Sequence, residues 1–140
     1  MIRLATIDDL PIILELAKEF HQKLPHRAVA FSDQKTISTI HEWLLSEREE
    51  KIILLAGEPV FAILAAMAER PFYSDDKVAV EVFWYSRKKS KWVLKIYEAY
   101  EFWANKIGCR MVFGGFLEEV EKYFKKRGYE RVNTSYGKVL

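Results

Sequence analysis

Apolar residues in the first third of the chain recur at helical spacing. Ile2 to Ala5 can form a short strand, after which Thr6 gives a helix start signal. The following helix ends near Lys23, and its apolar face is formed by Leu10, Ile13, Leu14, Leu16, Ala17 and Phe20. Ser32 and Asp33 can cap a second helix, whose apolar face is formed by Ile37, Ile40, Trp43, Leu44 and Leu45.

The middle of the chain consists of apolar runs that are separated by turn signals. Ile52 to Ala56 and Val60 to Ala68 flank the turn Gly57-Glu58-Pro59, which predicts an antiparallel hairpin. The second run is rich in alanine and is also compatible with a helix. Val78 to Tyr85 contains β-branched and aromatic residues and is predicted to be a strand.

The last third alternates between helical and strand patterns. A helix is expected from about Trp92 to Ile107, a short strand from Met111 to Phe113, a helix from Leu117 to Arg127, and a terminal strand or hairpin from Tyr129 to Val139. This order predicts a single α/β (α+β) domain over residues 1–140. Its sheet is expected to be mixed, mostly antiparallel, with roughly six to seven strands and about four helices on both faces.

Composition narrows the classes of function. A chain of 140 residues that is 50% hydrophobic can bury one core and is too short for two. A net charge of +2 gives no overall attraction to nucleic acid or to anionic membranes. Cys109 is the single cysteine, which excludes an intramolecular disulfide, and no Cys and His cluster has metal-ligand spacing. We therefore expect a cytoplasmic protein without a metal and without a nucleic-acid or membrane partner.

Three stretches of the sequence can be compared with known families: IRLATIDDLPIILELAKEF, then EVFWYS with the segments after it, and YFKKRGYERV. They resemble parts of the GNAT N-acetyltransferase superfamily, and small phage and bacterial acetyltransferase-like proteins in particular. The first looks like the first strand and helix of that family, and the last resembles its late helix and glycine turn. EVFWYS, a basic loop and YEAYEFWANKIG are similar to the strand, loop and helix that bind acyl-CoA. The resemblance covers nearly the whole chain. It implies direct transfer of an acetyl group from acetyl-CoA to a primary amine of a small molecule or protein.

The resemblance also places the cofactor site. In the family, the strand before the loop pairs its backbone with the pantetheine arm, which here implies Phe83, Trp84 and Tyr85. The family's phosphate loop resembles R/Q-x-x-G-x-G/A, and the corresponding residues here contain no glycine: Arg87, Lys88, Lys89, Ser90, Lys91, Trp92 and Val93. The four basic side chains are expected to bind the pyrophosphate directly at the start of a helix. The alternative is that this charge run is a solvated turn.

Glu81 is the residue that its own sequence context singles out. It interrupts an apolar run, and a buried unpaired carboxylate is costly, so it must be paired, hydrated or raised in pKa. A carboxylate at this place could deprotonate an incoming ammonium, directly or through water, and so act as the general base. The alternative is a structural carboxylate that pairs with a nearby arginine or lysine, or one that faces a solvated edge.

The general acid is implied by the resemblance alone. The family's tyrosine, four residues before the late glycine, corresponds to Phe124 here, so its neighbour Tyr123 becomes the candidate. Leu117 lies near the place of a family asparagine. These departures keep two other functions open. One is a catalytically weakened binding or regulatory protein, and the other is an adaptor whose aromatic surface binds another protein, including a second copy in a homodimer.

The other residues with reactive or stacking side chains are interpreted as structural. The histidines are expected at the surface, and Cys109 as a small buried residue. Gly114-Gly115 allows a bend or a close approach of the backbone. One set of aromatic residues could stack on bases but has the helical and strand spacing of a core: Trp84, Tyr85, Trp92, Tyr97, Tyr100 and Trp103.

Overall fold

The computed structural model describes residues 1–45, 50–115 and 118–140. These residues form the helices α1 (Leu10–Gln22), α2 (Asp33–Leu45), α3 (Lys91–Lys106) and α4 (Glu118–Lys126), with a 3-10 turn at Ile7–Asp9. The strands are β1 (Ile2–Leu4), β2 (Lys51–Ala56), β3 (Ala62–Glu69), β4 (Val78–Ser86) and β5 (Met111–Phe113). None of the described helices is both long enough and apolar enough to cross a membrane.

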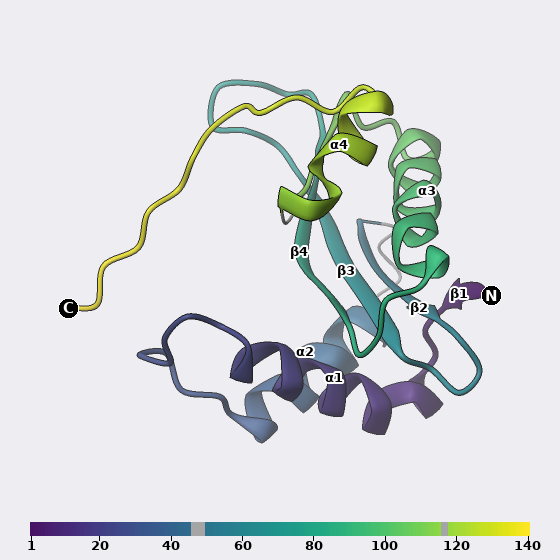
Figure 1. The fold of residues 1–140 in the computed structure, drawn as a ribbon, viewed down its shortest axis with the longest axis vertical. Helices are drawn as coiled ribbons and strands as arrows, with labels where there is room; N and C mark the ends of the chain where they lie inside the picture. The colour runs from purple at the N-terminus through teal and green to yellow at the C-terminus, as the bar shows by residue number, and fades with distance from the viewer. Residues whose placement is uncertain (46–49, 116–117) are drawn as a thin grey trace.

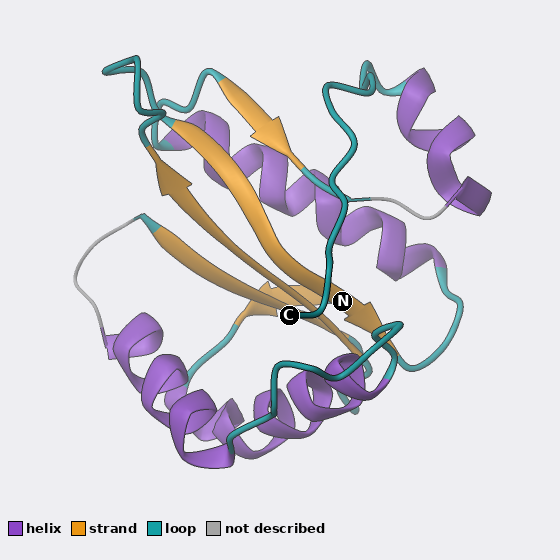
Figure 2. Cartoon of the chain, turned by 90° about the vertical axis from the view of Figure 1, so that its left-hand side faces the viewer, coloured by secondary structure: helices purple, strands orange, loops and turns teal. Residues whose placement is uncertain are grey.

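The strands form one mixed sheet in the order β1-β2-β3-β4-β5, in which only the pairing of β4 with β5 is parallel. Helices α1 and α2 cover one face of this sheet, and α3 lies on the other (Figures 1 and 2). The two faces have separate apolar clusters. Both contain residues of the central strands β2 and β3.

Strand β3 shows why the alanine-rich run is a strand and not a helix. Its side chains alternate between the two clusters: Ile63 and Ala65 pack toward α1 and α2, whereas Leu64 and Ala66 pack toward α3. Because both faces are covered, the strand reads as a continuous apolar run. The hairpin predicted around Gly57 is confirmed by the antiparallel pairing of β2 with β3.

Strand β4 contains an irregularity that positions the site. Ala66 of β3 pairs with Glu81, but Ala65 pairs with Phe83, so Val82 is an additional residue in β4. The residues of β4 that precede this bulge in the sequence pair with β5, and the last pair is Val80 with Phe113. In the described part of the chain, β4 has no strand partner on that edge from Glu81 onward.

The prediction of a terminal strand or hairpin over Tyr129 to Val139 is wrong. The segment contains no regular element and runs away from α4 (yellow in Figure 1), so the described sheet has five strands instead of six to seven. The neighbouring edge strand β5 has only three residues, and a hairpin without a packed face is marginal in water. The apolar side chains of Val132, Tyr136 and Leu140 are accordingly exposed.

Candidate active site

The Glu81 carboxyl lies on the α3 side of the sheet, immediately before the bulge in β4. The hydroxyl of Tyr97 donates a hydrogen bond to Glu81 Oε1 over 3.1 Å, and the backbone N–H of Gly115 donates a second one to the carboxyl. Burial raises the pKa of Glu81 to about 7, although both hydrogen bonds act in the opposite direction. No arginine or lysine of the described chain forms an ion pair with it, so its partners are neutral donors.

Tyr97 is enclosed in an aromatic cluster between α3, β4 and α4. Its ring is fully buried, with ring centroids 4.7 Å from Trp84 and 4.9 Å from Phe124. Burial is the main cause that raises the pKa of Tyr97 far above the ordinary tyrosine value, and the negative charge of Glu81 is the second. The phenol therefore stays protonated at neutral pH and acts toward the carboxyl as a hydrogen-bond donor.

A cleft of about 970 Å³ reaches Glu81. It is bounded by β4, the second half of α3, β5, α4 and the beginning of the C-terminal segment. Its charged lining is mixed in sign and largely paired: Arg127 contacts Glu101 over 2.8 Å, and Arg131 contacts Glu121 over 3.7 Å. The carboxyl is thus shielded from bulk water but lies on the wall of a space that can admit a substrate.

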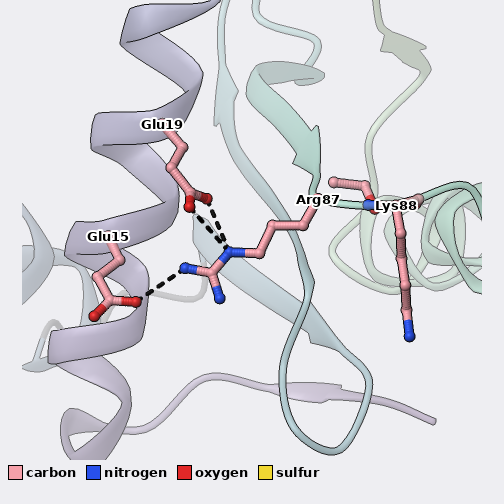
Figure 3. Close-up of polar contacts among 5 residues, drawn as sticks. Glu15, Glu19, Arg87 and Lys88 are labelled. Carbon is pink, nitrogen blue, oxygen red and sulfur yellow. Dashed lines mark hydrogen bonds and ion pairs between the residues drawn. The ribbon is translucent and has the colours of Figure 1, made fainter.

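The basic loop after β4 does not act as one cluster. Arg87 extends toward α1, where its Nε lies 2.9 Å from Glu19 and its Nη2 lies 2.9 Å from Glu15 (Figure 3). Lys88 points away from that pair, and its Nζ lies 4.4 Å from the centroid of the Phe61 ring. The Arg87 guanidinium is therefore held by ion pairs to α1, whereas the side chains of Lys88, Lys89 and Lys91 are exposed.

Helix α3 begins directly at this loop. Ser90 is its N-cap, and the Ser90 hydroxyl oxygen accepts a hydrogen bond from the Trp92 backbone N–H over 3.3 Å. Trp92 and Val93 occupy the first turn, and Lys91 Nζ lies 5.5 Å from the centroid of the Trp92 ring. The structure thus brings three exposed lysines to the positive end of a helix of 16 residues.

The strand residues implied for the pantetheine arm face opposite sides of the sheet. Phe83 and Tyr85 pack toward α1, where their ring centroids lie 5.2 Å and 6.5 Å from Phe20. Trp84 packs toward α3. All three follow the bulge, on the stretch of β4 that has no partner strand on the β5 side among the described residues.

The late helix presents Phe124, and not Tyr123, to the core. Phe124 is fully buried, and its ring meets that of Trp84 edge-on at 5.9 Å. Tyr123 is half-buried, stands at 89° to the Phe124 ring and lies beneath the guanidinium of Arg127. One residue along a helix turns a side chain by about 100°, so the two rings point in different directions. Leu117 lies outside the described residues.

Two partners of Glu81 were not identified from the sequence. Tyr97 was interpreted as a core aromatic residue, and its ring does lie in the core. A buried tyrosine hydroxyl also needs a hydrogen-bond partner, and in the structure this partner is Glu81. Gly115 belongs to the pair that was expected to allow close backbone approach. Its neighbour Gly114 meets that expectation, because a Cβ there would collide with the Tyr97 hydroxyl.

Comparisons with known proteins identify the architecture. No protein-family model and no curated protein matches the chain. Among solved structures, glucosamine-6-phosphate N-acetyltransferase from Arabidopsis thaliana is 18% identical with a TM-score of 0.74, covering 99% of this chain and 96% of that chain. An aminoglycoside 6′-N-acetyltransferase from Acinetobacter haemolyticus is 19% identical with a TM-score of 0.67, covering 99% and 97%.

A third neighbour is an aminoglycoside acetyltransferase from an uncultured soil metagenomic sample, solved in complex with sisomicin. It is 15% identical with a TM-score of 0.66, covering 100% of this chain and 96% of that chain. At these identities the likeness establishes the fold. The chain therefore has the GNAT-like fold that its sequence segments resemble.

Proposed function

We propose that the protein is an acyl-CoA-dependent N-acetyltransferase that moves an acetyl group directly from acetyl-CoA to a primary amine of a small molecule or protein. The observation that carries the proposal is the Glu81 carboxyl: it has a pKa of about 7, lies beside the bulge in β4 and borders the cleft. The acetyltransferase fold supports the reaction class.

Glu81 is the proposed general base. An acceptor amine is mostly an ammonium at neutral pH and cannot attack until it loses a proton. A carboxyl with a pKa near the working pH combines a large ionised fraction with useful basicity. Glu81 takes this proton, directly or through water, and the amine nitrogen then bonds to the acetyl carbon. As the thioester C–S bond breaks, the nitrogen releases its second proton to water and the sulfur leaves as the coenzyme A thiolate.

The cofactor is proposed to bind along β4 and at the start of α3. Backbone N–H groups in the stretch Phe83 to Tyr85 would hold the pantetheine arm and polarise the thioester carbonyl, because this edge has no strand partner in the described residues. Lys88, Lys89 and Lys91 would neutralise the pyrophosphate beside the α3 N-terminus. Ser90, Trp92 and Val93 form the helix start at which it would lie.

Tyr123 is the proposed donor of a proton to the departing thiolate. A coenzyme A thiolate is a stable leaving group, so this step needs less help than deprotonation of the amine. Replacing Tyr123 with Phe is expected to lower kcat moderately and to leave the KM for acetyl-CoA unchanged. A rate equal to that of the unmodified protein would remove Tyr123 from the mechanism.

A second candidate function is a binding or regulatory protein with weakened catalysis. Two observations favour it: Phe124 is buried at the place of the family's tyrosine, and Arg87 is engaged by Glu15 and Glu19. Such a protein would bind acetyl-CoA but would transfer its acetyl group slowly or not at all.

Calorimetric titration with acetyl-CoA at low salt, followed by mass spectrometry of amine mixtures, separates these functions. The amines are glucosamine 6-phosphate, sisomicin and a lysine-containing peptide. A heat of binding together with an acetylated amine supports the enzyme. Binding with every amine unmodified supports the second candidate. Absence of binding, with no rise in melting temperature in the presence of excess acetyl-CoA, contradicts both.

A further inference from the structure

We propose that Tyr97 is a positioning residue that holds the Glu81 carboxyl together with the backbone N–H of Gly115, and that Gly114 is required because any side chain there would displace the Tyr97 hydroxyl. The catalytic meaning of this arrangement rests on the proposed function, in which Glu81 is the base. The arrangement itself can be tested without any activity.

The first observation is that the Tyr97 hydroxyl has a fixed position. Its ring is fully buried, and it is surrounded by aromatic rings from β4, α3, α4 and the segment that follows α4. The centroid distances are 4.7 Å to Trp84, 4.9 Å to Phe124, 5.4 Å to Tyr100 and 6.2 Å to Tyr129. A ring enclosed in this way cannot swing aside without repacking its neighbours. The 3.1 Å hydrogen bond to Glu81 is therefore imposed by the core.

The second observation is the difference between two adjacent glycines. A Cβ on Gly114 would collide with the Tyr97 hydroxyl and would lie 2.9 Å from both Cε1 and Cζ of that ring. A Cβ on Gly115 would meet no atom of the described residues within 4 Å. Neither glycine has the positive φ that would demand glycine for its backbone, so Gly114 is required for space. The missing side chain gives the Tyr97 hydroxyl room beside the backbone that also carries the Gly115 donor.

The third observation is that, among the described residues, only neutral groups hold the carboxyl. Tyr100 on α3 also faces this region, but its hydroxyl donates to the Phe113 carbonyl over 2.9 Å. The charged groups on the surrounding elements line the cleft: Glu101, Arg110, Glu121, Lys125, Arg127, Glu130 and Arg131. None of them is a cause of the altered pKa of Glu81, which reflects burial opposed by Tyr97 and Gly115. Loss of one donor must therefore raise this pKa further.

A purely structural role for Tyr97 makes a different prediction. If the hydroxyl only satisfied the core, Tyr97→Phe and Tyr100→Phe would both lower stability and would leave the titration of Glu81 unchanged. If Tyr97 positions the carboxyl, only the first substitution changes this titration. Tyr100→Phe is thus a matched control, because it removes a buried tyrosine hydroxyl from the same helix.

The experiment is a carboxyl-carbon NMR titration of the full chain labelled with 13C-glutamate, with the Glu81 signal assigned by its loss in Glu81→Gln. We expect the midpoint to rise in Tyr97→Phe and in Gly114→Ala and to stay unchanged in Tyr100→Phe. With an accepted amine, kcat/KM of Tyr97→Phe should fall about 3- to 10-fold at pH 6 and converge with that of the unmodified protein at high pH.

An unchanged midpoint in Tyr97→Phe, or an equal rise in Tyr100→Phe, would overturn the positioning role. A raised midpoint without a change in the pH dependence of kcat/KM would leave the Tyr97 contact standing and contradict Glu81 as the base.

Urea unfolding tests Gly114 separately. Gly114→Ala should destabilise the Tyr97→Phe variant less than the unmodified protein, because the hydroxyl is gone; an equal loss in both would overturn the role of Gly114.

Discussion

The basic loop over residues 87–91 and the carboxyl of Glu81 belong to one continuous segment, but their charges are in opposite environments: the loop is exposed to solvent, and the carboxyl is largely buried. The loop has four cationic side chains, and its arginine is paired with two carboxylates on α1. Glu81 is a single acidic group without an ionic partner in the described chain, held by a phenol and an amide. The difference shows that solvent exposure, more than the number of charges, decides what a charged residue can do.

The energetics follow the same division. Water screens the loop, so each of its ion pairs contributes between nothing and about 1 kcal/mol to stability. The Glu81 carboxyl has lost most of its water, and its ionisation therefore opposes folding. The protein tolerates this cost at a position that borders its cleft, which is typical of a functional group.

The largest expected effect concerns the pH dependence of stability. Glu81 has a pKa of about 7 in the folded protein against an ordinary value of 4.5, so between these values the folded chain holds a proton that the unfolded chain has released. The contribution of Glu81 to stability is therefore greatest below pH 4.5 and is lost as pH rises through 7, a loss of about 3 kcal/mol.

Urea unfolding of the unmodified protein and of Glu81→Gln at pH 5 and pH 8 measures this effect. The glutamine variant lacks the titrating group, so it should not lose this free energy as pH rises. The free energy of unfolding of the variant minus that of the unmodified protein should therefore increase from pH 5 to pH 8. Two curves that stay parallel across this range would show that Glu81 has an ordinary pKa.

An intermediate effect is expected from the exposed lysines of the loop. Replacing Lys88, Lys89 and Lys91 with alanine should raise the KM for acetyl-CoA about tenfold at low salt and leave kcat unchanged, because charge-assisted phosphate contacts would be lost. The matched control replaces three exposed lysines elsewhere: Lys23, Lys35 and Lys138. An equal rise in KM in both triple variants would assign the effect to net charge and not to a phosphate site.

The smallest expected effect concerns Arg87. Because Glu15 and Glu19 hold its guanidinium at α1, Arg87→Ala should raise the KM for acetyl-CoA by less than about threefold and lower stability by less than about 1 kcal/mol. The variant Glu15→Gln/Glu19→Gln should lower stability by a similar amount, and combining it with Arg87→Ala should add little. A large rise in KM in Arg87→Ala alone would place this residue among the phosphate ligands.

Most of the fold was predictable because periodicity is a local property of the sequence. The helix near residues 92–107 and the strand near residues 78–85 were located within a few residues, since their apolar faces are complete in the sequence. The terminal strand was not predictable in the same way. The residues between Tyr129 and Val139 say nothing about whether the sheet offers an edge long enough to pair with them.

Part of the candidate site could be predicted where a residue differs in polarity from its neighbours in the sequence. Glu81 interrupts an apolar strand, and its sequence context alone required a compensating environment. Tyr97 does not contradict its surroundings, because its ring fits the core and only its hydroxyl has a special partner. The pairing of Arg87 with Glu15 joins residues 72 positions apart, and the bulge at Val82 depends on the register with β3. Neither the ion pair nor the bulge produces a pattern among neighbouring residues of the sequence.

The most direct test of the central claim is the pH dependence of kcat/KM for acetyl transfer by the unmodified protein and by Glu81→Gln, measured with one amine so that its own ionisation contributes equally. We predict a rise through pH 7 for the unmodified protein. For Glu81→Gln we predict a loss of about 100-fold or more together with the disappearance of this rise. A variant that keeps both the rate and the rise would contradict the account.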